Sequence, residues 1–163
     1  MISIELLAPA KDSECGRAAI DCGADALYIG APRFGARENA GNSLEDIAAL
    51  IEYAHRYWVR VYATVNTLLH DHEIPQALDL IDRLRAVDID GLIIQDTGLL
   101  ECALPPLPVI ASTQMHNNTP EKIAFLEQVG FQRAILAREL SLEEIRAVRR
   151  AAPFPDPDFD IAW

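Results

Sequence analysis

Residues 87–95 read VDIDGLIIQ, which is the end of a helix, a tight turn, a short apolar run and then a polar side chain. The same order recurs at residues 22–30 (CGADALYIG) and 129–138 (VGFQRAILAR). Apolar runs without polar alternation are typical of parallel strands that are covered on both faces. Further runs of this type stand at residues 4–8, 59–65 and 109–111. The sequence therefore predicts six buried parallel strands.

Helical segments with recognisable ends lie between these strands. Ser43 with Asp46, and Ser141 with Glu144, have the spacing of a capping box at a helix start. Thr119–Pro120 supplies an N-cap and a first-turn proline. Apolar residues recur every three or four positions and would face the sheet: Ile47, Ile51 and Ala54; Ile74, Leu78, Ile81 and Leu84; Leu142, Ile145 and Val148. The predicted order is a strand followed by a helix, six times.

Six successive βα units fit two architectures, an incomplete (β/α) barrel of the TIM type or an open doubly wound parallel sheet. Four consecutive strands run into polar residues at their carboxyl ends: Asn66, Gln95, Ser112–Gln114 and Arg138. In a barrel these ends meet at one mouth, whereas in an open sheet only the strands beside the switch point need them. The sequence favours the barrel, with residues 1–151 as a partial barrel domain and residues 152–163 as an irregular tail rich in proline and aspartate.

Composition limits the classes of function. The chain has 163 residues, 50% of them hydrophobic and 24% charged, which suits one globular domain. No apolar run is long enough to span a bilayer, and strand-like residues begin directly after Met1, so we expect a cytoplasmic protein that does not bind membranes. The formal net charge of −11 would repel a phosphate backbone, which makes direct binding of nucleic acid unfavourable.

The three cysteines, Cys15, Cys22 and Cys102, form no C-x-x-C pair and have no histidine at zinc spacing. We expect them to be free thiols. Cys15 and Cys22 stand seven residues apart, with Ala18 and Ala19 between them, so all four are expected on one buried helix face.

The polar strand ends are the candidate ligand site. Amide and guanidinium groups form good hydrogen bonds with planar polar groups or carboxylates. Asn, Ser and Asp are also ordinary turn and cap residues, and Arg138 with Glu139 could form only a salt bridge. The recurrence of larger side chains favours a mouth that binds a small molecule or a peptide. Its predicted lining is Arg37, Asn39, Asn66, Gln95, Gln114 and Arg138. Two carboxylates accompany it: Asp96 at the mouth, and Glu5 at a strand start, expected beside an arginine such as Arg138 or Arg37.

Catalytic chemistry is harder to assign. Ser112 with His70 or His116 would supply a nucleophile and a base, but no G-x-S-x-G motif surrounds the serine. The run His70-Asp71-His72-Glu73 contains four metal-ligating residue types, although adjacent loop residues rarely point at one ion. We therefore predict no metal site and assign no catalytic residue.

Seven segments in the same order resemble the N-terminal barrel of the peptidase U32 family and span nearly everything up to Ala151. They are ELLAPA (5–10), GADALYIG (23–30), FGARENA (34–40), VNTLLHDHE (65–73), LIIQDTG (92–98), ASTQMH (111–116) and AILARELSLEEI (134–145). The resemblance implies a (β/α) barrel and a collagenase-like protease. It also implies an alternative, because several relatives support hydroxylation of tRNA, rRNA or ubiquinone, some of them with an iron–sulfur cluster.

The sequence differs from the family pattern at its C-terminal end. Family members continue into further barrel strands, a His-Gly-Ala-x-Cys-like segment and the cysteines that hold the cluster. None of the three cysteines here matches those positions, so we expect no iron–sulfur cluster or other cofactor in this segment. We expect a truncated, catalytically incomplete barrel, which would associate with itself or pair with the missing half.

Overall fold

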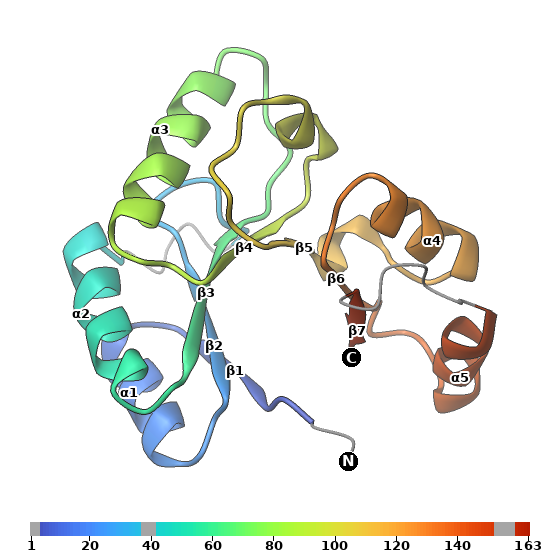
Figure 1. The fold of residues 1–163 in the computed structure, drawn as a ribbon, viewed down its shortest axis with the longest axis horizontal. Helices are drawn as coiled ribbons and strands as arrows, with labels where there is room; N and C mark the ends of the chain where they lie inside the picture. The colour runs from blue at the N-terminus through green and yellow to red at the C-terminus, as the bar shows by residue number, and fades with distance from the viewer. Residues whose placement is uncertain (1–3, 37–41, 152–158) are drawn as a thin grey trace.

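A computed structural model describes residues 4–36, 42–151 and 159–163 of the chain (Figure 1). Within these ranges, seven strands form one parallel sheet in which neighbours follow chain order from β1 to β7. They are β1 (Leu7–Ala10), β2 (Ala26–Gly30), β3 (Arg60–Val65), β4 (Gly91–Ile94), β5 (Val109–Ala111), β6 (Arg133–Ile135) and β7 (Asp160–Ala162). A doubly wound sheet would have the order 3-2-1-4-5-6. The sequential order therefore confirms the incomplete TIM-type barrel and excludes the open-sheet alternative.

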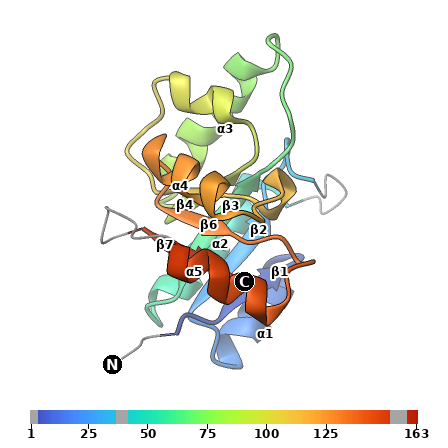
Figure 2. The same cartoon turned by 90° about the vertical axis from the view of Figure 1, so that its right-hand side faces the viewer.

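Helices connect successive strands. They are α1 (Ser13–Asp21), α2 (Leu44–His55), α3 (Ile74–Ala86), α4 (Pro120–Gln128) and α5 (Leu142–Ala151), with the short 3₁₀ helices η2 (Thr97–Glu101) and η3 (Thr113–Met115). Figure 1 shows α1, α2 and α3 along one side of the strands, and α4 and α5 along the other. Figure 2 shows the side on which α4 and α5 lie facing the viewer. None of the helices within the described ranges combines the length and the apolar character needed to cross a membrane.

The helix starts confirm the predicted caps. Ser43 Oγ accepts the Asp46 amide, and the Asp46 carboxylate in turn accepts the Ser43 amide, which completes a capping box. Ser141 and Glu144 repeat these contacts before α5. Thr119 caps α4 through the Lys122 amide, at 3.3 Å. These local bonds explain why the helix starts could be read from the sequence.

The strands pack on two faces, as in a barrel wall. The outward residues Leu27, Ile29, Leu92 and Ile94 are fully buried against the helices. The inward residues Ala26, Tyr62, Ile93 and Ile110 form a separate apolar cluster in the barrel interior. Successive strand residues point to opposite faces, so both faces must be apolar when both are covered. This double burial is the reason for the continuous apolar runs.

An ionic cluster closes the amino-terminal end of the interior. Arg133 at the start of β6 pairs with Asp160 of β7 through two hydrogen bonds of 2.5 and 2.7 Å. It also donates to Glu5, just before β1, and Glu5 accepts a further bond from Arg60 of β3. Burial alone would lower the pKa of Arg133, but hydrogen bonds to the Asp160 and Glu5 carboxylates outweigh it and raise the pKa. Glu5 thus lies beside arginines other than the predicted Arg138 or Arg37, because the sheet curls β6 toward β1.

The tail prediction was wrong for the last residues. Asp160–Ala162 form β7, which pairs in parallel with β6, and the Leu136 amide donates to the Ala162 carbonyl at 2.8 Å. The edge of β6 supplies the hydrogen-bond partners that the isolated sequence does not reveal. Residues 152–158 lie outside the described residues, so their predicted irregular structure stays a prediction.

The packing predicted for two cysteines was also wrong. All three cysteines are free thiols, as expected, but Cys15 and Cys22 are exposed. The face of α1 that is buried carries Gly16 and Ile20 instead. A Cβ on Gly16 would stand 2.7 Å from a methyl carbon of Leu50, so α1 packs against α2 through its glycine. Close approach at Gly16 sets the rotation of α1 and turns both thiols outward.

Candidate functional site

A hydrogen-bond network joins the carboxyl ends of the strands. Asn66, directly after β3, accepts the Ala36 amide at 2.9 Å and donates to Ser112 Oγ at 3.2 Å. Ser112 follows β5 and is 1% exposed. Two side chains thus connect the loop after β2, the end of β3 and the end of β5. These bonds fix the positions of the strand ends relative to one another.

Asn117 extends this network to β6. Its side chain is fully buried, and Nδ2 donates to the carbonyls of Ile135 at 2.8 Å and Ser112 at 2.9 Å. Its Oδ1 has no hydrogen-bond partner among the described residues. His116 before it adopts a left-handed backbone (φ 57°), which ends η3. Sequence analysis missed Asn117, and the only signal was its place in the polar run after β5.

The predicted lining residues behave differently from one another. Gln95 Nε2 donates to the Gln114 carbonyl at 3.4 Å, and the Gln114 amide donates to Ser112 Oγ at 3.2 Å. Asn66, Gln95 and Gln114 therefore belong to one network. Arg138 is exposed, and within the described part of the chain no hydrogen bond or ion pair joins it to them or to Glu139. Arg37 and Asn39 lie outside the described residues.

Asp96 is a structural carboxylate in this arrangement. One of its oxygens accepts the Gly98 amide at 2.8 Å and caps η2, and the other accepts the Leu69 amide at 3.0 Å. The carboxylate thus ties the loop after β3 to the end of β4. Both oxygens are engaged with backbone, which leaves Asp96 poorly placed for acid–base chemistry.

No nucleophile and base pair forms within residues 4–36, 42–151 and 159–163. The Ser112 hydroxyl contacts Asn66 and the Gln114 amide, not a histidine. His116 lies against Asn118 at 2.9 Å, and the His70 ring stacks on His72 with centroids 5.6 Å apart. The described residues also contain no group of three His, Cys, Asp or Glu side chains placed to hold a metal ion. The prediction that this segment holds no cluster or metal stays a prediction.

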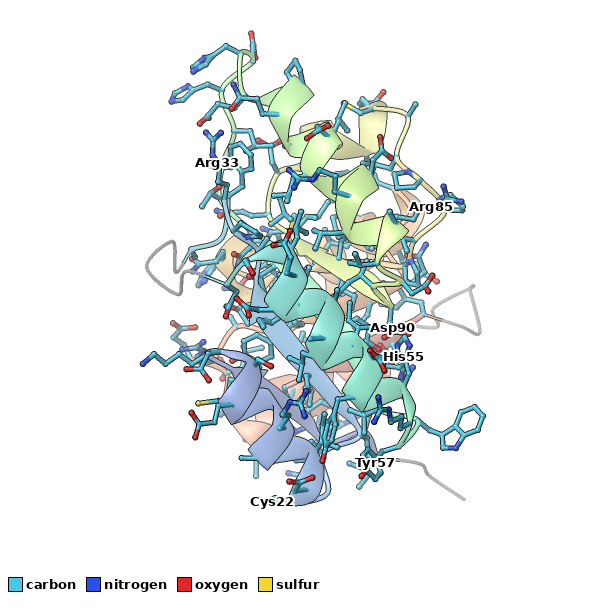
Figure 3. All side chains as sticks on the ribbon, turned by 90° about the vertical axis from the view of Figure 1, so that its left-hand side faces the viewer. Cys22, Arg33, His55, Tyr57, Arg85 and Asp90 are labelled. Carbon is cyan, nitrogen blue, oxygen red and sulfur yellow. The ribbon has the colours of Figure 1, made fainter. Side chains whose placement is uncertain are left out.

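A groove of about 460 Å³ lies outside the mouth, between the loop after β2 and α3. Arg33 on its wall stacks on Phe34 and donates to Gln76 at 2.8 Å, and Figure 3 shows it beside the upper part of α3. The volume is in the range of small-molecule sites. The groove is, however, open, and half of its lining residues are exposed, so it does not replace the strand ends as the candidate site.

The chain is similar to known proteins over most of its length. A family model for Peptidase family U32 matches residues 11–155. This chain belongs to the U32 family. The U32 chain is 52% identical to the 23S rRNA 5-hydroxycytidine C2501 synthase of Escherichia coli (strain K12) over 148 residues. This match covers 91% of the U32 chain and 23% of that relative. It is 34% identical over 149 residues to tRNA hydroxylation protein P1 of Bacillus subtilis (strain 168), covering 89% of the chain and 35% of that relative.

A solved structure of a U32 peptidase supports the same architecture. It superposes with a TM-score of 0.69 at 17% identity, and the match covers 93% of the U32 chain and 67% of that structure. A sequence identity of 17% shows a shared fold and does not show a shared function. The U32 chain therefore spans between about a quarter and two thirds of the proteins it matches here.

Proposed function

We propose that this U32 chain is the barrel part of an RNA-hydroxylation protein. The observation that carries the proposal is the 52% identity to a synthase named for 5-hydroxycytidine in 23S rRNA, joined by the tRNA hydroxylation protein at 34%. The identity to the synthase, over 91% of the chain, supports a role in hydroxylation more strongly than the family name supports a protease. The protease expected from that family name is the weaker alternative.

The chemistry of the strand ends fits this proposal. Gln95 and the exposed Gln114 carry neutral amide groups, which suit the edge of a nucleobase that is splayed out of an RNA strand. Asn66 and the buried Ser112 are bonded to each other and hold the strand ends in place beneath them. These groups suit peptide hydrolysis poorly, because no activated nucleophile stands among the described residues. The role of this site is to hold and orient the base. The net charge of −11 means that phosphate contacts come from elsewhere in a longer protein.

The test is a chimera of the E. coli synthase in which this chain replaces the 148 matched residues. It is expressed in a strain that lacks the synthase, and 5-hydroxycytidine at position 2501 is measured by mass spectrometry of 23S rRNA. We expect the modification to return. Asn66→Ala in the chimera should lower its level, whereas Glu121→Ala, an exposed change on α4, should leave it unchanged.

The same purified chimera is incubated with gelatin and casein. Cleavage that is abolished by Ser112→Ala would favour the peptidase reading. A folded chimera that never modifies C2501 would contradict the hydroxylation proposal.

A further inference from the structure

An accessible aromatic ring lies on the inner wall of the barrel, below the polar strand ends. Tyr28 of β2 packs against the interior cluster of Ala26, Tyr62, Ile93 and Ile110. These four residues are at most 3% exposed, whereas Tyr28 is half-buried. A buried tyrosine hydroxyl usually has a hydrogen-bond partner, but none of the described residues bonds to the hydroxyl of Tyr28. Part of the ring and its hydroxyl are therefore free to contact a ligand.

The inner wall above Tyr28 carries small residues. Side chains two residues apart on a strand point to the same face, so the next inward position on β2 is Gly30, which has no side chain. Gly30 pairs with Thr64 of β3, and the Thr64 hydroxyl donates to the Ile29 carbonyl at 3.4 Å, along the wall. The interior of a TIM barrel is usually filled by layers of bulky side chains. Neither β2 nor β3 places a large side chain on this wall between Tyr28 and the mouth.

The residues beside Tyr28 complete a surface that suits a flat polar ring. Pro9 of β1 is the direct partner of Tyr28 in the sheet and is exposed, and Figure 1 shows β1 next to β2. Pro9 therefore adds an apolar side chain next to the aromatic ring. Gln95 stands two residues after the inward Ile93 of β4, on the same interior side, and its amide donates to the Gln114 carbonyl. The wall thus offers an aromatic face, an apolar flank and amide groups.

We propose that Tyr28 stacks on the face of the nucleobase whose edge is bound by the amides of Gln95 and Gln114. This inference rests on the proposed role in RNA hydroxylation and adds a base-binding residue to it. Bases that are splayed out of an RNA strand are commonly held by stacking on an aromatic side chain. Stacking needs no contact with phosphate, so it fits a chain with a net charge of −11. Tyr28 sets the plane of the base, and the amides bind its edge.

The chimera with the E. coli synthase tests this role through three variants. Tyr28→Leu keeps an apolar side chain and removes the aromatic face, so it should lower 5-hydroxycytidine at C2501 by about tenfold. Tyr28→Phe keeps the ring and should restore most of that loss. Tyr57→Leu is the matched control and should leave the level unchanged, because Tyr57 is 57% exposed just before β3, at the opposite end of the sheet from the mouth. Equal levels in Tyr28→Leu and Tyr57→Leu, or in Tyr28→Leu and Tyr28→Phe, would overturn the proposal.

A purely structural role for Tyr28 predicts a different result. Within the described residues the sheet is open between β1 and β7, and further strands of a longer protein would then bury Tyr28 as core. In that case Tyr28→Leu would lower the Tm of the purified chimera, while C2501 modification per folded molecule stayed at the wild-type level. This result would overturn the proposal. Stacking predicts the reverse, which is reduced modification by a chimera whose Tm is close to that of Tyr57→Leu. Immunoblotting of the soluble chimera normalises the modification level.

Binding to chain 1–163 is measured separately by NMR, with cytidine at millimolar concentration as the probe. A base stacked on an aromatic ring lies in its ring current, so H5 and H6 of cytidine should shift upfield with the wild type and Tyr28→Phe, and not with Tyr28→Leu. No shift with the wild type, or an equal shift with Tyr28→Leu, would overturn the stacking. A proline-rich gelatin peptide that shifts the Tyr28 ring protons where cytidine does not would also overturn it, in favour of a peptide ligand. A chimera that fails to modify C2501 while the cytidine shift persists would count only against the proposed function.

Discussion

Asn117 and Gln114 stand three residues apart in the sequence and have opposite roles. Asn117 is fully buried and donates to the carbonyls of Ser112 and Ile135, whereas Gln114 is exposed and enters the network through its backbone. Removing this buried donor takes its bond from the Ile135 carbonyl and leaves the Ser112 carbonyl with the Met115 amide alone, and the lost bonds cost part of the desolvation free energy of these groups. Of these two neighbouring polar residues, Asn117 thus holds the strand ends together and Gln114 has its side chain exposed at them.

Asn117→Ala should therefore lower the free energy of unfolding by about 2–3 kcal/mol, measured by urea denaturation. Gln114→Ala is the comparison, with an expected change within about 0.5 kcal/mol because its side chain is exposed. If Gln114→Ala unfolds the protein while Asn117→Ala does not, our assignment of the two roles is reversed.

At the scale of an element, the start of α1 depends on one charged cap. Asp12 accepts the Cys15 amide at 2.8 Å, and this backbone hydrogen bond, with the Cys15 side chain, lowers the pKa of Asp12 below its ordinary value of 3.8. A lowered folded-state pKa means that the ionised cap stabilises the fold above the unfolded-state pKa. That stabilisation is lost as the pH falls through the folded-state pKa.

Asp12→Asn keeps a capping oxygen without the charge. Its Tm should lie below that of the wild type at pH 6, and the difference should shrink as the pH falls below about 3.8. Thermal unfolding of both proteins between pH 3 and 6 measures it. A Tm difference that does not depend on pH would show that the charge of Asp12 does not contribute to the cap.

At the scale of the whole molecule, the cluster around Arg133 joins segments that are far apart in the chain. The partners Glu5 and Arg133 are 128 residues apart, and they connect the start of β1 to β6 across the interior. Burial also raises the pKa of Tyr62, whose ring centroid lies 6.0 Å from the Arg133 guanidinium, and the Glu5 carboxylate adds to this rise. The cluster fixes the curl of the sheet at its closed end.

Arg133→Met should lower the free energy of unfolding by about 1–3 kcal/mol, because the half-exposed Asp160 loses its cation and the largely buried Glu5 keeps only Arg60. The double variant with Glu5→Gln should lose less than the sum of the two single changes. A double-mutant cycle in denaturant measures the coupling. Strict additivity would mean that the ion pair does not hold β1 and β6 together.

The edges of the sheet make a second prediction at this scale. Within the described residues β1 and β7 each have one unpaired edge, and such edges seek further strands. We expect chain 1–163 to associate in sedimentation experiments at high concentration, through these edges. A strict monomer would contradict the edge-pairing expectation.

The sequence alone determined the features that depend on short stretches of chain. Continuous apolar runs identified six strands, because a strand covered on both faces has no polar face. The caps at Ser43, Thr119 and Ser141 were readable because each bonds an amide three residues away. Polar residues after the strands indicated the barrel, since parallel strands bring their carboxyl ends to one side.

Only the tertiary structure decided the features that depend on partners distant in sequence. β7 exists because the edge of β6 offers it hydrogen bonds, and the cysteines of α1 face water because Gly16 lies against Leu50. Glu5 pairs with Arg133 because the sheet curls, and Asn117 is buried because two strand ends close over it. Local spacing records which groups a segment can offer. Which partner each group meets is decided when the chain folds and brings separate segments together, up to 128 residues apart for Glu5 and Arg133, and no local pattern contains that information.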